Sequence, residues 1–136
     1  MNYEKLTIYT DGGARGNPGP AAIGAVIYDN EKNIIQEISE YIGETTNNQA
    51  EYRACLSAME AALKLGAQEL DFYLDSELVV KQLKREYKVK NKDLAPLFIK
   101  IYNLSQQFIK VKFTHINREE NKLADSLVNK ALDAGM

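Results

Sequence analysis

The stretch LTIYTDGGARGNPGPAAIGAVIYD, residues 6–29, places one acid, Asp11, between an alternating apolar run and a loop rich in glycine and proline. Leu6 and Ile8 alternate with less apolar neighbours, which is the period of a β-strand with one buried face. The glycines and prolines that follow predict a tight turn into a second strand. We therefore expect Asp11 at the end of the first strand, held in place by the sheet.

Periodicity along the remaining chain predicts further strands and four helices. Asn47 or Asn48 is expected to cap the first helix, Gly66 to end it, and Ser76 to cap the second. Strands are expected at residues 5–10, 23–29, 34–43, 69–74 and 110–116, and helices at 47–66, 76–87, 94–108 and 119–132.

This order of elements predicts an α/β fold, with a mixed sheet and helices on its faces. In such sheets polar function gathers at the ends of strands. No internal repeat or linker interrupts the chain, and 136 residues leave no room for a second domain. We therefore expect one domain over residues 1–136.

Composition also restricts where the protein acts. Cys55 is the only cysteine, so no intramolecular disulfide can form. The first 20 residues lack a signal-peptide pattern, and no apolar run approaches the roughly 20 residues that span a bilayer. We expect a cytoplasmic protein that has no membrane partner.

The positive charge is concentrated in one segment. The chain carries a net charge of −2, but residues 81–92 hold six lysine or arginine side chains against Glu86 alone. This basic segment therefore has a local charge of +5 and leaves −7 for the rest. Such a run is usually a solvated helix face, and the alternative is a surface that follows phosphates.

Four acids stand at strand ends or near helix starts: Asp11, Glu51, Asp75 and Asp125. Each alone has an ordinary explanation as a turn former, a cap or a surface charge. Together they indicate one cluster, because like charges held close are unfavourable unless a cation neutralises them. Asp125 shares a helix stripe with Asn121, away from the apolar face. Ligands that are all oxygen favour Mg²⁺, with Mn²⁺ as a possible substitute, over zinc.

The motifs TDGGARGNPGPAAIGAVI, TTNNQAEYRA, LDSELVVKQL and REENKLADSL, in this order and spacing, resemble the type 1 ribonuclease H family. The resemblance implies a ribonuclease H-like fold with a five-stranded mixed sheet. It also implies an endoribonuclease that hydrolyses the RNA strand of RNA/DNA hybrids, leaving 5′-phosphate and 3′-hydroxyl ends. The family roles assign Asp11, Glu51, Asp75 and Asp125 as ligands of two Mg²⁺ ions, a pair suited to in-line phosphodiester displacement.

Contacts to both strands of the hybrid are also expected. Glycine lets a backbone approach nucleic acid closely, which makes two glycines of the first loop candidates. Some relatives carry an arginine for the DNA phosphate where this chain has Glu44, a departure from their pattern. The candidate contacts are backbone groups of Gly12 and Gly13, the family's minor-groove positions Asn17, Asn48 and Gln49, its phosphate positions Thr46 and Asn91, and Lys84 and Lys88 of the basic segment.

Relatives often have a mobile histidine before the last acid that helps product release. Counting back from Asp125 places His115 near that spacing, but His115 alternates with Val111 and Phe113 on an expected strand. The loop NREEN resembles the shorter variety in which an arginine takes this role. We therefore assign the auxiliary role to Arg118 and expect His115 to be packed.

The resulting hypothesis is a monomeric Mg²⁺-dependent endoribonuclease acting on RNA/DNA hybrids, with no obligatory protein partner. A binding domain of the same fold without activity is the alternative outside enzymes, and it would ordinarily lack one or more of the acids. A related nuclease acting on another substrate, such as double-stranded RNA, is the alternative within enzymes.

Overall fold

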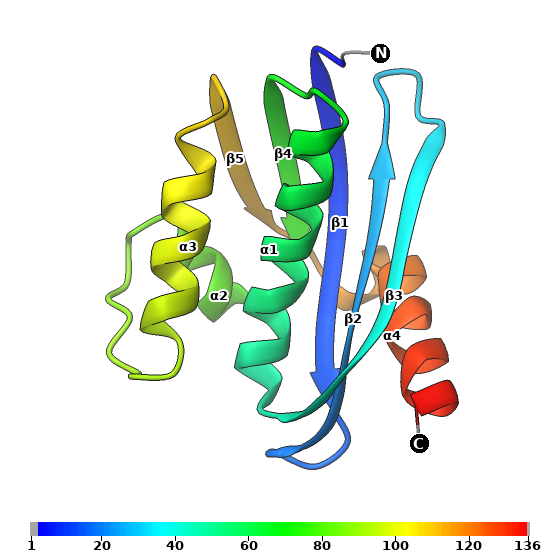
Figure 1. Cartoon of the computed structure of the whole chain (residues 1–136), viewed down its shortest axis with the longest axis vertical. Coiled ribbons are helices and arrows are strands. Elements are labelled where there is room, and N and C mark those ends of the chain that lie inside the picture. Colours follow the sequence, from blue (N-terminus) through cyan, green and yellow to red (C-terminus); the bar gives the residue numbers. More distant parts are fainter. Residues whose placement is uncertain (1–2, 136) are drawn as a thin grey trace.

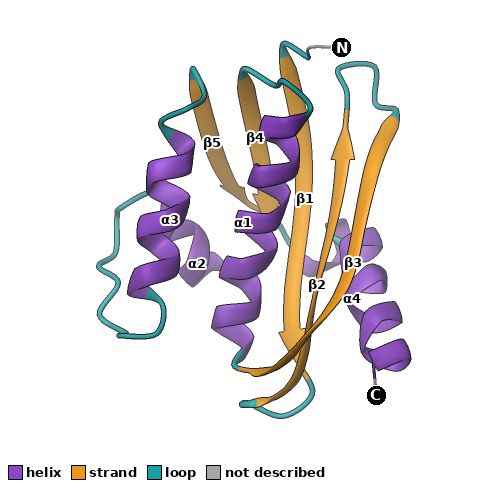
Figure 2. Cartoon of the chain, in the orientation of Figure 1, coloured by secondary structure: helices purple, strands orange, loops and turns teal. Residues whose placement is uncertain are grey.

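The computed structural model describes residues 3–135, which form one five-stranded sheet with helices on both faces (Figures 1 and 2). The sequence of elements agrees with the predicted order. The bounds are β1 Lys5–Ala14, β2 Gly19–Tyr28, β3 Ile34–Thr45, α1 Asn47–Lys64, β4 Glu69–Leu74, α2 Glu77–Leu83, α3 Ala95–Ser105, β5 Lys110–His115, the 3₁₀ helix η1 Arg118–Glu120 and α4 Lys122–Gly135.

The sheet is mixed, as predicted, and its strand order is β3-β2-β1-β4-β5. β1, β2 and β3 form an antiparallel meander, whereas β4 pairs in parallel with both β1 and β5. α1 carries the chain from the edge strand β3 across the sheet to β4, which pairs in parallel with β1, and the α2–α3 segment is the crossover between the parallel neighbours β4 and β5. The carboxyl ends of β1 and β4 therefore lie side by side.

The two faces of the sheet are covered unequally. α1 lies in front of the sheet in Figure 1 and buries Tyr52 and Met59 in the main core, together with Leu6 and Ile8 of β1. α4 lies behind the sheet and packs mainly on β2 and β3, where Val128 joins a smaller apolar cluster. None of the helices described has both the length and the apolar character needed to cross a bilayer.

The strand that carries Asp11 is longer than predicted. β1 continues to Ala14 because its residues still pair with β2, and Asp11 lies opposite Gly24. Its pairing with β4 ends earlier, at the Tyr9–Tyr73 pair. Asp11 therefore lies inside a strand but at the point where the two parallel strands separate, and its side chain is half-buried there.

Helix boundaries also differ from those predicted. Thr46, rather than Asn47 or Asn48, caps α1, and its side chain accepts a hydrogen bond from the Gln49 N–H at 3.2 Å. Gly66 ends the helix as predicted, with a φ of 79°.

The second predicted helix is shorter than expected and the fourth begins later. Ser76 caps α2 as predicted, but α2 ends at Leu83 and Arg85 has a φ of 64°, so most of the basic segment is not helical. The predicted fourth helix is divided into η1 and α4.

Candidate active site

Three carboxylates meet where β1 and β4 separate. Asp11 and Asp75 each follow, by two residues, a tyrosine of the paired Tyr9–Tyr73 register, so they lie on the same face of the two chain segments. Glu51 reaches the same place from α1, where it is buried. One oxygen from each of the three carboxylates lies within 4.8 Å of the others.

Gly12 allows α1 to approach this closely. A Cβ atom at Gly12 would lie 2.3 Å from the carbonyl carbon of Ala50, so only glycine lets the helix backbone pack against β1 here. The Gly12 N–H donates a hydrogen bond of 2.6 Å to Glu51 Oε1. The glycine predicted as a nucleic-acid contact therefore has its N–H bound within the protein, where it orients a site carboxylate.

Asn121 is a site residue that sequence reasoning did not identify. Its side chain is only 1% exposed, and its Nδ2 donates to Asp75 Oδ2 and to the carbonyl oxygen of Thr10, both at 2.8 Å. The amide thus ties the Asp75 carboxylate to the neighbouring strand β1. Its position four residues before Asp125 was visible in the sequence, but nothing there indicated its partners.

A cleft of about 350 Å³ collects most of the predicted site residues. Asp125 enters it from the first turn of α4 and lies within hydrogen-bonding reach of Asp11. Asn47 and Ser76 also line it without having been predicted as site residues. The predicted residues in the cleft are Asp11, Gly12, Gly13, Asn48, Glu51, Asp75, Arg118 and Asp125.

Burial and mutual repulsion make the cluster unfavourable without a cation. Burial, then the charges of Glu51 and Asp75, raise the pKa of the Asp11 carboxyl far above its usual range. Burial also raises the pKa of Glu51, although its hydrogen bonds with Asp11 and the Gly12 N–H oppose the rise. In the absence of a cation, burial and repulsion therefore favour retention of a proton by the Asp11–Glu51 pair.

The donor set fits a hard divalent cation. The carboxylates of Asp11, Glu51 and Asp75 converge without histidine or thiolate, which favours Mg²⁺ or Mn²⁺ over softer metals. A bound cation would also offset the charge repulsion that, after burial, raises the pKa values of Asp11 and Glu51.

The auxiliary candidates are placed differently from each other. Arg118 lines the cleft, and its charge lowers the pKa of Glu51, although it belongs to η1 rather than to a loop without regular structure. His115 is exposed at the end of β5 and does not line the cleft. The expectation that His115 is packed was wrong: it is the last residue of the edge strand β5, and it is exposed there.

The remaining predicted contacts lie outside the cleft lining, and several are engaged within the protein. Asn17 Oδ1 accepts from the Asn47 N–H at 3.0 Å, and Asn91 Oδ1 accepts from the N–H groups of Asp93 and Leu94. Thr46 caps α1 through the Gln49 N–H. One side-chain oxygen of Asn17, of Asn91 and of Thr46 thus accepts hydrogen bonds from backbone N–H groups of the protein. A ligand would have to bind through the other polar atoms of these residues.

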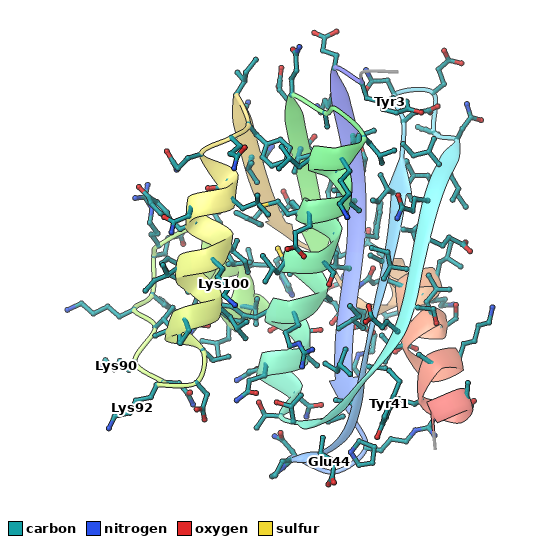
Figure 3. All side chains as sticks on the ribbon, viewed as in Figure 1. Tyr3, Tyr41, Glu44, Lys90, Lys92 and Lys100 are labelled. Atoms are coloured by element: carbon teal, nitrogen blue, oxygen red, sulfur yellow. The ribbon has the colours of Figure 1, made fainter. Side chains whose placement is uncertain are left out.

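The basic segment comprises the last turn of α2 and most of the connection from α2 to α3. Lys84 forms an ion pair with Glu86 at 3.2 Å, and Lys88 is exposed. Lys90 and Lys92 project outward from this connection, at the lower left of Figure 3. Glu44 is labelled at the bottom of the same figure. The segment therefore presents its positive charge to solvent beside α3.

Comparison with known proteins gives consistent matches. The sequence profile of the family described as Reverse transcriptase-like matches residues 9–131. The bifunctional protein Rv2228c of Mycobacterium tuberculosis is 42% identical over 131 residues, which cover 96% of this chain and 36% of that protein. The chain therefore spans about a third of the length of this relative.

Two further matches cover nearly the whole length of both chains compared. The ribonuclease H of Prosthecochloris aestuarii is 35% identical over 147 residues, which cover 95% of this chain and 96% of the relative. The crystal structure of LC11-RNase H1 in complex with an RNA/DNA hybrid superposes with a TM-score of 0.91 at 47% identity. The superposition covers 96% of this chain and 98% of that one.

Proposed function

The chain belongs to the type 1 ribonuclease H family, and we propose from this that it is an endoribonuclease that cleaves the RNA strand of RNA/DNA hybrids. The observation that carries the proposal is the convergence of Asp11, Glu51 and Asp75 within 4.8 Å in an open cleft, with Asp125 beside them. The same class of nucleic acid is bound in the crystal structure of LC11-RNase H1, a protein 47% identical to this one.

The four acids would hold two divalent cations, with Mg²⁺ as the proposed ion and Mn²⁺ as a substitute. When bound, such a pair supplies the activated water and the charge stabilisation for an in-line displacement that leaves 5′-phosphate and 3′-hydroxyl ends. The Gly12 N–H and the Asn121 amide hold the carboxylates of Glu51 and Asp75 in orientation, at 2.6 Å and 2.8 Å. Both hydrogen bonds stabilise the charged form of the acid that accepts them.

Arg118 is the proposed auxiliary residue because its guanidinium lies at the cleft and carries positive charge toward the substrate phosphates. The hybrid would extend from the cleft toward two regions, the β1–β2 loop with the start of α1, and the basic segment. The proposed contacts there are Gly13, Asn17, Thr46, Asn48, Gln49, Asn91, Lys84 and Lys88.

In this proposal residues 1–136 act as one catalytic domain, in the cytoplasm, as a monomer that requires no protein partner. The monomer is tested by light scattering at the concentrations used for hydrolysis. If activity required a second copy of the chain, the hydrolysis rate per protein molecule would rise with protein concentration.

The decisive experiment compares labelled RNA in three forms: an RNA/DNA hybrid, double-stranded RNA and single-stranded RNA. Each is incubated with protein in Mg²⁺, in Mn²⁺ and in chelator. We expect cleavage of the hybrid alone, with products whose 3′ ends can be extended by a polymerase because they carry a hydroxyl.

Two variants make the comparison specific. Asp75→Asn should abolish cleavage, whereas Glu60→Gln, which removes an exposed charge from α1 outside the cleft, should leave cleavage unchanged. Hydrolysis by Asp75→Asn at the rate of the unmodified chain would refute the assignment. Equal cleavage of double-stranded RNA would favour the alternative nuclease.

A further inference from the structure

A second hollow lies on the sheet face that α4 covers only in part. It has a volume of about 540 Å³ and is bordered by β1, β4, the β2–β3 turn and the start of α4. Its lining residues and those of the catalytic cleft do not overlap. The segment from Arg118 to Asp125 lies between the two: Arg118 and Asp125 line the cleft, whereas Glu120 and Asn121 line the hollow, although the Asn121 amide donates to Asp75 of the cleft.

Three tyrosines from adjacent strands form an aromatic corner in this hollow. The rings of Tyr9 and Tyr73 are stacked, with centroids 5.0 Å apart and planes at 20°. The ring of Tyr28 meets Tyr9 at 78°, with centroids 5.7 Å apart. All three side chains are only partly buried. A planar aromatic ligand entering this corner would meet the face of one ring and the edge of another, the two geometries that aromatic pairs prefer.

Four charged side chains line the hollow: Lys5, Asp29, Lys32 and Glu120. Lys5 is paired with Asp71 at 2.9 Å and Glu120 accepts from the Asn117 N–H at 3.3 Å, so of the two cations Lys32 is the one without an ion-pair partner among the described residues. The Asp29 carboxylate already accepts hydrogen bonds from the Glu31 and Asn33 N–H groups, both at 2.9 Å, which closes the β2–β3 turn. Lys32, in the same turn with a φ of 67°, lines the hollow and adds a positive charge. The charge of Asp29 is thus stabilised within the turn, whereas the Lys32 ammonium can attract an anion.

We propose that this hollow binds a mononucleotide, with its base in the tyrosine corner and its phosphate near Lys32. The volume lies within the range of roughly 300–1,000 Å³ that is usual for small-molecule sites. Base stacking on tyrosine tolerates any base, because every base has a π-face. The proposal does not depend on the proposed hydrolysis, since the hollow shares no lining residue with the cleft and the groups proposed to bind the ligand do not include Asn121, which donates to Asp75.

The test is an NMR titration of ¹⁵N-labelled protein with AMP in metal-free buffer, up to about 10 mM, where a millimolar site is largely occupied. We expect the largest amide shifts at Tyr9, Tyr28 and Tyr73. Ribose 5-phosphate, which lacks the base, should leave these amides unchanged. Shifts confined to the cleft or the basic segment, no shifts with AMP, or equal shifts with ribose 5-phosphate would overturn the proposal.

Variants separate the contributions of the ring and the charge. Tyr73→Leu keeps the apolar bulk but removes the ring, and should weaken AMP binding about fivefold or more. Tyr102→Leu changes an exposed tyrosine of α3 outside the hollow and should bind AMP normally. Lys32→Ala should weaken binding of AMP but not of adenosine.

Outcomes with the variants are equally decisive. Unchanged AMP affinity in a folded Tyr73→Leu variant would overturn the aromatic site. If that variant fails to fold, Tyr28→Leu makes the same test, and normal binding by it would have the same meaning. An equal loss for AMP and adenosine in Lys32→Ala would overturn the phosphate position.

Discussion

Replacing Asp11 with asparagine tests the carboxylate cluster through protein stability, independently of catalysis. Oxygens of the three converging carboxylates lie within 4.8 Å of one another, and at this spacing two full charges repel by roughly 3 kcal/mol at an effective dielectric constant of about 20. Retaining a proton relieves the repulsion. Holding an aspartic acid protonated at pH 7 costs about 1.4 kcal/mol per pH unit above its ordinary pKa, or roughly 4 kcal/mol at most.

Asparagine avoids this cost because it has no charge to neutralise. Its Nδ2 can donate to a neighbouring carboxylate but its Oδ1 cannot, so the whole cost is not recovered. We therefore expect Asp11→Asn to raise the free energy of unfolding by about 1–3 kcal/mol at pH 7 without metal. For a chain of this length that is a rise of roughly 3–12 °C in the melting temperature.

The gain should depend on pH in a defined direction. The pKa of Asp11 is raised above its usual 3.8 by folding, so at pH values between the ordinary and the raised pKa the folded chain binds more protons than the unfolded chain. The stability of the unmodified chain without metal should therefore fall as pH rises through this window. The asparagine variant lacks this contribution. The difference between them should be near zero below about pH 4 and largest at neutral to alkaline pH.

In Mg²⁺ the unmodified chain should become more stable than the Asp11→Asn variant. An ion that binds only the folded state at 100 times its Kd stabilises that state by about 2.7 kcal/mol, and the variant has lost one ligand charge. Melting curves by circular dichroism at several pH values, in chelator and in Mg²⁺, measure both effects. Glu60→Gln is the control, since it removes one exposed charge from the helix of Glu51. A variant that melts below the unmodified chain in chelator at alkaline pH, or gains equally from Mg²⁺, would refute the reasoning.

Three further predictions concern other parts of the site. Gly12→Ala should lower the free energy of unfolding by about 2 kcal/mol or more, because its Cβ would lie 2.3 Å from Ala50 carbon; an unchanged melting temperature would contradict the close approach. Arg118→Ala should reduce kcat on hybrid about tenfold with little change in KM. His115 is exposed, so His115→Ala should change the free energy of unfolding by less than about 0.5 kcal/mol and leave kcat intact. A loss of kcat in His115→Ala and none in Arg118→Ala would return the auxiliary role to the histidine. Loss of basic-segment charge should reduce the log–log salt slope of hybrid binding by roughly 0.9 per phosphate contact, and an unchanged slope would make the segment an ordinary solvated surface. The variant for this test carries alanine at Lys84, Lys88 and Lys90.

Much of the fold was predictable because its signals are local. The alternation of Leu6 and Ile8, the helical period after Asn47 and the capping serine before α2 each depend on residues only a few positions apart. Such patterns identify elements and their order, and the order in turn favours a mixed sheet. They do not determine ends, which explains why β1 extends beyond its expected end at residue 10.

The acids of the site were predictable from the sequence, but the hydrogen bonds that orient them were not. The four motifs contain Asp11, Glu51, Asp75 and Asp125, and the prediction that these acids form one cluster needed only their chemistry and the resemblance. The hydrogen bond from Asn121 to Asp75 joins residues 46 positions apart. No local pattern encodes such a pair.

The sequence by itself therefore determined the order of the elements, the family and the acids. The tertiary structure decided three matters: the backbone contact of Gly12 with α1, the exposure of His115 and the corner formed by the stacked tyrosines Tyr9 and Tyr73 with Tyr28. Each depends on the register of neighbouring strands and on which sheet face a helix covers. These relations are set by the packing of the whole domain, because hydrophobic burial is non-directional and acts between residues distant in sequence.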